Sequence, residues 1–177
     1  MSDGALSQAE IDALLAGVDS ADSPAMPAAG GSDADRKAIQ DFLSSTVDAQ
    51  SSNLSMMTNS KVAISGPQGG FMNRDTFLGQ LPDTVTVIKA DFSSGFPGEH
   101  LYLMGEATAK SIAGLMNKEE NIELDDMAMS VIGEAVGTIV GSQITALTAK
   151  TGNKSIANAP PEATNVPKAV AALPGGS

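Results

Sequence analysis

Residues 124–150 read LDDMAMSVIGEAVGTIVGSQITALTAK and constrain the architecture more than any other part of the chain. Their apolar members recur at helical spacing, and acidic residues precede them, which suits the positive N-terminal end of a helix. Gly152 follows at the position of a C-terminal cap. These features predict a long helix whose apolar face is buried against other elements.

A weaker copy of this pattern lies 93 residues earlier, over residues 35–59. The pairs that coincide at this offset are Ile39 and Ile132, Val47 and Val140, Gln50 and Gln143, Leu54 and Leu147, Lys61 and Lys154, and Pro67 and Pro160. We therefore predict a duplicated half, with two long helices related by a pseudo-two-fold axis. At the same offset the hairpin that begins at Thr84 would recur at residue 177, so we expect the second half to be truncated.

Between the two helices the sequence changes from helical to strand-like patterns and back. We expect a short strand over residues 61–65, a hairpin of strands over 84–92 and 99–104, and a helix over 107–117. Helices and strands mix without strict βαβ alternation. The prediction is an α+β domain in which two long helices pack on an antiparallel sheet.

Composition divides the chain into four segments. Residues 1–17 are patterned, residues 18–34 form a flexible linker rich in Pro, Gly, Ala and Asp, residues 35–161 carry the globular periodicity, and residues 162–177 thin into a linker or loop. We therefore expect one domain that carries a tethered peptide at its N-terminal side.

The overall composition argues against several classes of function. The chain has 177 residues, a net charge of −11, no Cys, no Trp and one His. An acidic surface repels polyphosphate, so we expect no nucleic-acid binding, and the chain has no run of about 18 apolar residues for membrane insertion. Without Cys, and with His100 alone in an alternating strand-like run, no metal site and no cofactor are expected.

The N-terminal peptide carries a complete set of helix-start signals. Ser7 and Glu10 have the spacing of a capping box, and Leu6 and Ile11 sit where a hydrophobic staple would close it. A helix this short is unstable alone in water and needs a partner surface. An apolar helix face tethered by a flexible linker is typical of a recognition peptide that binds in the groove of another protein. The alternative is a helix that docks on its own domain or frays.

The same residues resemble a known family. Residues 6–15, LSQAEIDALL, closely resemble the opening of the flagellar motor switch proteins FliM and FliY, which binds the phosphorylated response regulator CheY. The resemblance implies that the partner-binding residues are Leu6, Ser7, Gln8, Glu10, Ile11, Asp12, Leu14 and Leu15. Residues 35–161, with 124–142 and the Pro160-Pro161 turn as the strongest part, resemble the CheC/CheX/FliY phosphatase-type domain, which is itself an internal duplication.

The resemblance implies a site on each long helix. In the family a Glu engages a lysine of the regulator's active site, and an Asn three residues later orients water for attack on the aspartyl phosphate. Here Glu134 and Asp41 occupy the Glu positions, while Gly137 and Ser44 replace the Asn. Both water-positioning amides are therefore missing, and we expect a docking surface without efficient catalysis.

Two further expectations concern this site. Ser130 matches the small or acidic residue that precedes the Glu in the family, and Lys37 takes its place in the first half. Gly137 costs roughly 1 kcal/mol of helix propensity relative to Ala, which favours a close backbone approach at that point.

The function that we expect is a chemotaxis and flagellar motor switch component that captures phosphorylated CheY. Its other partners would be flagellar switch-ring proteins, and its location would be cytoplasmic, at the flagellar basal body. One alternative is an active aspartyl-phosphate phosphatase that uses Gln50 or Gln143 as the amide, although each lies over two helical turns, about 13 Å, from its carboxylate. A purely structural motor subunit is the third possibility.

Overall fold

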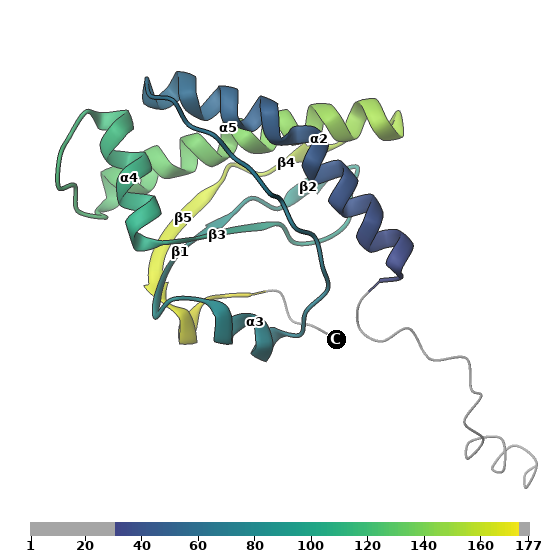
Figure 1. Cartoon of the computed structure of the whole chain (residues 1–177), viewed down its shortest axis with the longest axis horizontal. Helices are drawn as coiled ribbons and strands as arrows, with labels where there is room; N and C mark the ends of the chain where they lie inside the picture. Colours follow the sequence, from purple (N-terminus) through teal and green to yellow (C-terminus); the bar gives the residue numbers. More distant parts are fainter. Residues whose placement is uncertain (1–30, 174–177) are drawn as a thin grey trace, which may run out of the picture.

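The computed structural model describes residues 31–173, which form helices and antiparallel strands in the α+β arrangement that the sequence predicts (Figure 1). The helices are α2 (Asp33–Thr58), α3 (Arg74–Gln80), α4 (Glu106–Asn117), α5 (Asp126–Thr151) and the 3₁₀ turn η1 (Lys168–Val170). The strands are β1 (Thr84–Lys89), β2 (Phe92–Ser94), β3 (Leu101–Gly105), β4 (Ala157–Asn158) and β5 (Glu162–Pro167).

The two long helices confirm the duplication. Helices α2 and α5 each have 26 residues, and their bounds differ by the same 93 positions at both ends. Their caps match as well: Ser32 and Asp125 are N-caps whose side chains accept a backbone N–H, and Asn59 and Gly152 are left-handed C-caps. The repeat thus includes the signals that start and stop each helix.

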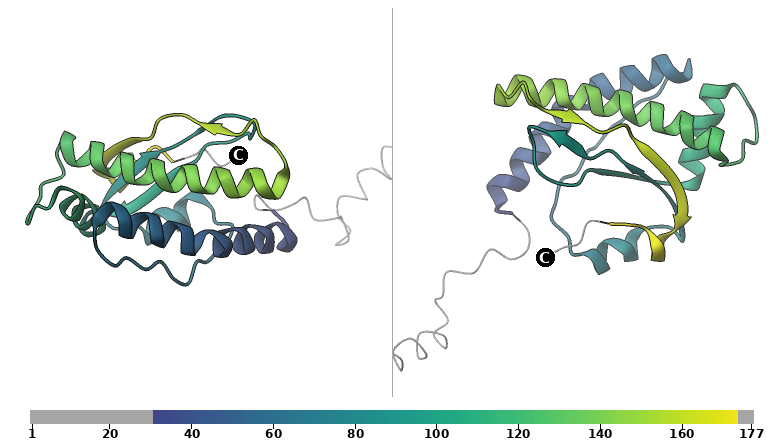
Figure 2. Two further views of the ribbon diagram at one scale, coloured as in Figure 1. Left: turned by 90° about the horizontal axis from the view of Figure 1, so that it is seen from above. Right: turned by 180° about the vertical axis from the view of Figure 1, so that it is seen from behind.

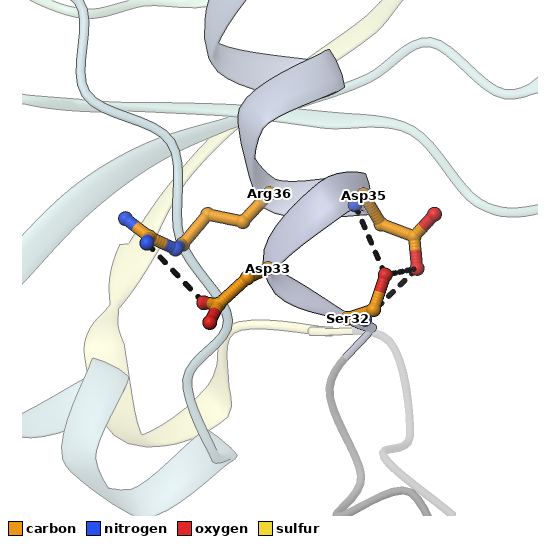
Figure 3. Close-up of polar contacts among 4 residues, drawn as sticks. All are labelled: Ser32, Asp33, Asp35 and Arg36. Atoms are coloured by element: carbon orange, nitrogen blue, oxygen red, sulfur yellow. Dashed lines mark hydrogen bonds and ion pairs between the residues drawn. The ribbon is translucent and has the colours of Figure 1, made fainter.

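The start of α2 shows why the boundary between linker and domain lies earlier than expected. Ser32 and Asp35 form a reciprocal capping box, in which the Ser32 hydroxyl accepts from the Asp35 N–H at 3.2 Å and the Asp35 carboxylate accepts from the Ser32 N–H at 2.8 Å (Figure 3). The Ser32 hydroxyl also donates to the Asp35 carboxylate at 2.7 Å, and this bond, together with the one from the Ser32 N–H, lowers the pKa of Asp35. The helix begins at Asp33, so residues 33 and 34 belong to the domain and the expected linker boundary at 34 is wrong.

The main sheet has the strand order β3-β1-β5, with both pairings antiparallel. The central strand β1 is buried on both faces: Thr86 and Ile88 face the helices, whereas Val85 and Val87 face the opposite side. That opposite face is covered in part by Ala171 and by other residues around η1. The predicted hairpin of 84–92 and 99–104 is confirmed as β1 and β3, with β2 separated from β1 by a break at residues 90–91.

Strand β5 corrects the expectation that residues 162–177 form a linker or loop. Residues 162–167 pair with β1 over its full length, from Thr84 opposite Pro167 to Lys89 opposite Glu162. The composition of this segment is rich in Pro and Ala, but β1 supplies the backbone partners that make it a strand. The described part of the domain therefore extends to Leu173.

The expected strand over residues 61–65 is not formed. This segment runs from the end of α2 to α3 across the front of the molecule (Figure 1). Its amides bond to side chains of α2 instead of to a strand: Val62 N–H donates to Ser55 Oγ at 2.9 Å and Ile64 N–H donates to Ser51 Oγ at 2.9 Å. The corresponding part of the second half contains β4 and β5, so the two halves differ here.

Helices α2, α4 and α5 form a layer on one side of the sheet, in which α5 lies beside both α2 and α4 (Figure 2). Helices α5 and α4 contact strands, while α2 packs mainly on these two helices, so only one of the two long helices lies directly on the sheet. Within residues 31–173, α5 alone is long and apolar enough to cross a membrane, with a mean hydropathy of 1.3 over its most apolar window. Its buried residues, Ile132, Val136 and Val140 among them, are part of the protein core.

The single histidine lies in an aromatic cluster directly before β3. The His100 ring stacks on Phe92 with centroids 5.1 Å apart, and its centroid is 4.9 Å from that of Tyr102. Its Nδ1 is buried and has no hydrogen-bond partner among the described residues. Burial lowers the pKa of His100, because the charged imidazolium would lose its hydration.

This burial predicts a pH dependence of stability. The unfolded chain binds a proton at His100 at higher pH than the folded protein does, so His100 contributes stability above about pH 6.5 that is lost as the pH falls through the lower pKa of the folded state. Asp91, beside it, has a lowered pKa and stays ionised in this window. We expect His100→Phe to remove this part of the decline in the free energy of unfolding, as measured by urea titrations at pH 7.5, 6.5 and 5.5. An equal decline in both proteins would contradict the assignment.

Candidate functional site

The site is an open cavity of about 990 Å³ between α5 and β5. It is lined by Leu124 just before α5, by residues 161–166, and along α5 by Asp126, Met129, Ser130, Gly133, Glu134, Gly137 and Thr138. Ser130, Gly133, Glu134 and Gly137 lie at spacings of three and four, which place them on one face of the helix. The structure thus brings Ser130, Glu134 and Gly137 to one place, as the family resemblance implies.

Pro161 packs on α5 at two of the glycines that line the cavity. An ideal Cβ at Gly137 would lie 3.4 Å from Pro161 Cγ, and one at Gly133 would lie 3.5 Å from Pro161 O. Pro161 therefore packs directly on the helix between two small residues one turn apart. The close approach expected at Gly137 is confirmed, and it gives a packing reason for a residue that weakens the helix.

Glu134 carries an exposed carboxylate at the cavity. Neither Lys nor Arg within residues 31–173 forms an ion pair with it. Asp126 and Glu162 also line the cavity, so its rim is acidic. The Glu134 carboxylate is solvated, has no cationic partner within residues 31–173 and has two further carboxylates nearby. It is therefore able to bind a cationic side chain of a partner protein.

The equivalent position in the first half is already occupied by a cation. Lys37 Nζ lies 3.0 and 3.2 Å from the two carboxylate oxygens of Asp41, one helical turn away. Lys37 stands where the second half has Ser130, so the first half carries its own lysine at the carboxylate. Asp41 is exposed but does not line the α5 cavity.

Three polar side chains of α2 and α5 that the sequence offers as sources of an amide or hydroxyl are engaged within the domain. Ser44 Oγ donates to Gln40 O at 2.8 Å, and Gln50 Nε2 donates to Thr46 Oγ1 at 2.9 Å. Gln143 is buried and accepts a hydrogen bond from the Tyr102 hydroxyl. None of these three replaces the missing asparagine at Gly137.

Pro161, from the turn that the sequence singled out, and strand β5 directly after it contribute to the cavity, and the β5 residues Thr164 and Asn165 were not expected there. Pro161, Thr164 and Asn165 line the cavity, and Asn165 lies opposite the buried Thr86 in the β1–β5 register. The signal that could have found them is the alternation of Ala163 and Asn165 with β-branched neighbours directly after the Pro-Pro turn. That pattern is short, and the Pro- and Ala-rich composition of residues 162–177 favoured a linker over a strand.

One group of expected residues cannot be placed in the structure. The partner-binding peptide, Leu6 to Leu15, lies outside the described residues. Within residues 31–173, three or more His, Asp or Glu side chains nowhere gather closely enough to hold a metal ion.

Comparisons with known proteins agree with this geometry. No family model matches the chain. The flagellar motor switch phosphatase FliY of Bacillus subtilis (strain 168) is 30% identical over 153 residues, which make up 83% of this chain and 40% of that relative. The X-ray crystal structure of Thermotoga maritima FliY shares the fold, with a TM-score of 0.72 at 19% identity over 83% of this chain and 77% of that one. These two similarities support a FliY/CheC-like family for this chain, which spans 40% of the length of the Bacillus subtilis relative.

Proposed function

We propose that this protein is a flagellar motor switch component that captures the phosphorylated form of a CheY-type response regulator. The N-terminal peptide, Leu6 to Leu15, would hold the regulator, and the α5 cavity would contact its active-site face. Binding at the motor would place the protein at the basal body, next to other switch-ring proteins. The chain spans 40% of the length of the relative it matches, so these assignments concern the peptide and this domain.

The observation that carries the proposal is the state of Glu134. Its carboxylate is exposed at the rim of a cavity and has no cationic partner within residues 31–173, although Asp41 in the equivalent place has Lys37 at 3.0 Å. A lysine of the regulator would complete the pair at Glu134. This asymmetry favours the second half as the docking site.

The same cavity argues for weak catalysis. Phosphoryl transfer depends mostly on positioning and electrostatic stabilisation, and the family positions its water with an amide on the helix. Gly137 has no side chain, and Pro161 occupies the space directly beside it. The second candidate function is an active phosphatase, favoured by the printed name of the Bacillus subtilis relative, a flagellar motor switch phosphatase.

Restoring the amide is expected to restore catalysis. We expect Gly137→Asn to accelerate the loss of phosphate from the regulator by about tenfold or more, because a positioned catalytic group commonly contributes on the order of 10²-fold. The new Cβ would lie 3.4 Å from Pro161 Cγ, so the proline ring has to yield by only a few tenths of an ångström. The measurement is the decay of radiolabelled phosphoryl regulator with and without each protein.

The matched control is Gly141→Asn, one turn further along α5, where an added Cβ meets nothing within 4 Å. This control is expected to leave the decay at the rate of the wild-type protein. Rapid decay with the wild-type protein itself would contradict the proposal and support the active phosphatase.

A further inference from the structure

The cavity beside Glu134 contains an amide whose direction is fixed by the sheet. Asn165 on β5 lies directly opposite Thr86 on β1. Thr86 is fully buried, and its hydroxyl donates to Asn165 Oδ1 at 3.3 Å. A buried hydroxyl needs an acceptor, and this bond holds the carbonyl side of the Asn165 amide toward β1. The amide nitrogen therefore points away from that bond.

The amide nitrogen is free and accessible. Asn165 Nδ2 donates to no group in the described part of the chain. His100 Nδ1 is the one buried polar side-chain atom in this range that lacks a partner, so Nδ2 of the half-buried Asn165 is open to solvent. Asn165 lines the same cavity as Glu134 and Gly137, so its two N–H donors are available to a group that enters there.

The neutral amide of Asn165 and the carboxylate of Glu134 together suit a partner that presents both a cation and an anionic oxygen. The carboxylate of Glu134 attracts a cation, and the amide of Asn165 can donate to an anionic oxygen without adding another negative charge to an acidic rim. An aspartyl phosphate next to a lysine, the pair that the proposed function places here, offers both groups.

We propose that Asn165 donates hydrogen bonds to the phosphoryl group of the captured regulator, from the sheet side of the cavity, where the helix at Gly137 offers no amide. Thr86 acts as the positioning residue for this amide. The inference rests on the proposed function and deepens it: Glu134 provides affinity for the regulator, and Asn165 provides selectivity for its phosphorylated form.

The test compares the affinity of the full chain for the regulator in two forms, unmodified and activated with beryllofluoride as the phosphoryl mimic. A charge-assisted hydrogen bond commonly contributes about tenfold or more in affinity. We expect Asn165→Ala to weaken binding of the activated form by about tenfold and to leave binding of the unmodified form within twofold. Asn165→Asp has the same size but carries a negative charge, so it should weaken binding of the activated form further.

Two additional variants make the test specific. Thr86→Val frees the amide to rotate and is expected to cause a smaller loss, confined to the activated form. Asn53→Ala, on α2 and away from this cavity, is the matched control and should bind both forms as the wild-type protein does.

The outcomes separate this inference from the proposed function. If Asn165→Ala and Asn165→Asp change both forms equally or change neither, while Glu134→Gln still weakens binding, the role of Asn165 is wrong and the proposed function stands. If the wild-type protein binds neither form, or if Glu134→Gln has no effect, the proposed function is wrong.

Discussion

Glu134→Gln is expected to weaken binding of the phosphorylated regulator by about 30-fold or more. Removing one partner of a desolvated, hydrogen-bonded charge pair at an interface costs about 2–5 kcal/mol, much of it because the other charge stays buried without a partner. Glutamine keeps the size of the side chain and its helix propensity, so α5 should be unchanged. The measurement is the dissociation constant of the full chain, with the free energy of unfolding as a check on the fold.

The duplication supplies a matched control for this result. Asp41→Asn removes the equivalent carboxylate of the first half, which Lys37 already neutralises at 3.0 Å. A lysine of the partner would have to displace Lys37, so we expect Asp41→Asn to change the affinity by less than threefold. Equal losses for the two variants would show that both halves dock the regulator and would contradict the asymmetry proposed here.

Gly95→Ala is expected to destabilise the domain by about 3 kcal/mol, the largest effect of a single methyl group in the described structure. Gly95 has φ +75°, which L-residues with a Cβ seldom adopt, and an ideal Cβ would lie 2.5–2.6 Å from backbone atoms of Ser155 and Ile156. Backbone cannot move aside as a flexible side chain can, so overpacking adds about 1–3 kcal/mol to the conformational cost. The methyl group would also disturb the hydrogen bond from Asn153 Nδ2 to Gly95 O, which is 2.6 Å long.

Two other glycines separate these contributions. Gly66 has φ +60° and nothing within 4 Å of an added Cβ, so Gly66→Ala measures the conformational cost alone, about 1 kcal/mol. Gly70 has open space and no positive φ, so Gly70→Ala should be nearly neutral or stabilising. Chemical denaturation of the three variants provides the comparison. A loss at Gly95 no larger than the loss at Gly66 would mean that the contact with Ser155 relaxes at little cost.

Helices α2, α4 and α5 were predictable from the sequence because their signals are local, whereas the short helix α3 (Arg74–Gln80) was not expected. Periodicity, acidic first turns and left-handed caps at Asn59 and Gly152 lie within or next to the helices themselves. The strands depend on partners far away in the chain. The segment 61–65 has a strand-like pattern, but serine hydroxyls of α2 take its amides, while the less regular segment 162–167 becomes a strand because β1 pairs with it.

The residues of the site fall into the same two groups: some have local sequence signals, and others depend on distant partners. Ser130, Glu134 and Gly137 could be assigned from the sequence because they lie at helical spacing on one helix and match the family pattern. The role of Asn165 and the contact of Pro161 with α5 could not, because they depend on the packing of β5 against α5. The pairing of Lys37 with Asp41 also required coordinates, since the spacing of four residues permits an ion pair without requiring one.

The central claim is that this chain recognises the phosphorylated state of a response regulator. It is tested most directly by titrating the wild-type full chain with the regulator in its unmodified and beryllofluoride-activated forms under identical conditions. We expect binding of both forms, with a dissociation constant at least tenfold lower for the activated form. Equal affinity for the two forms, or no binding of either, would contradict it.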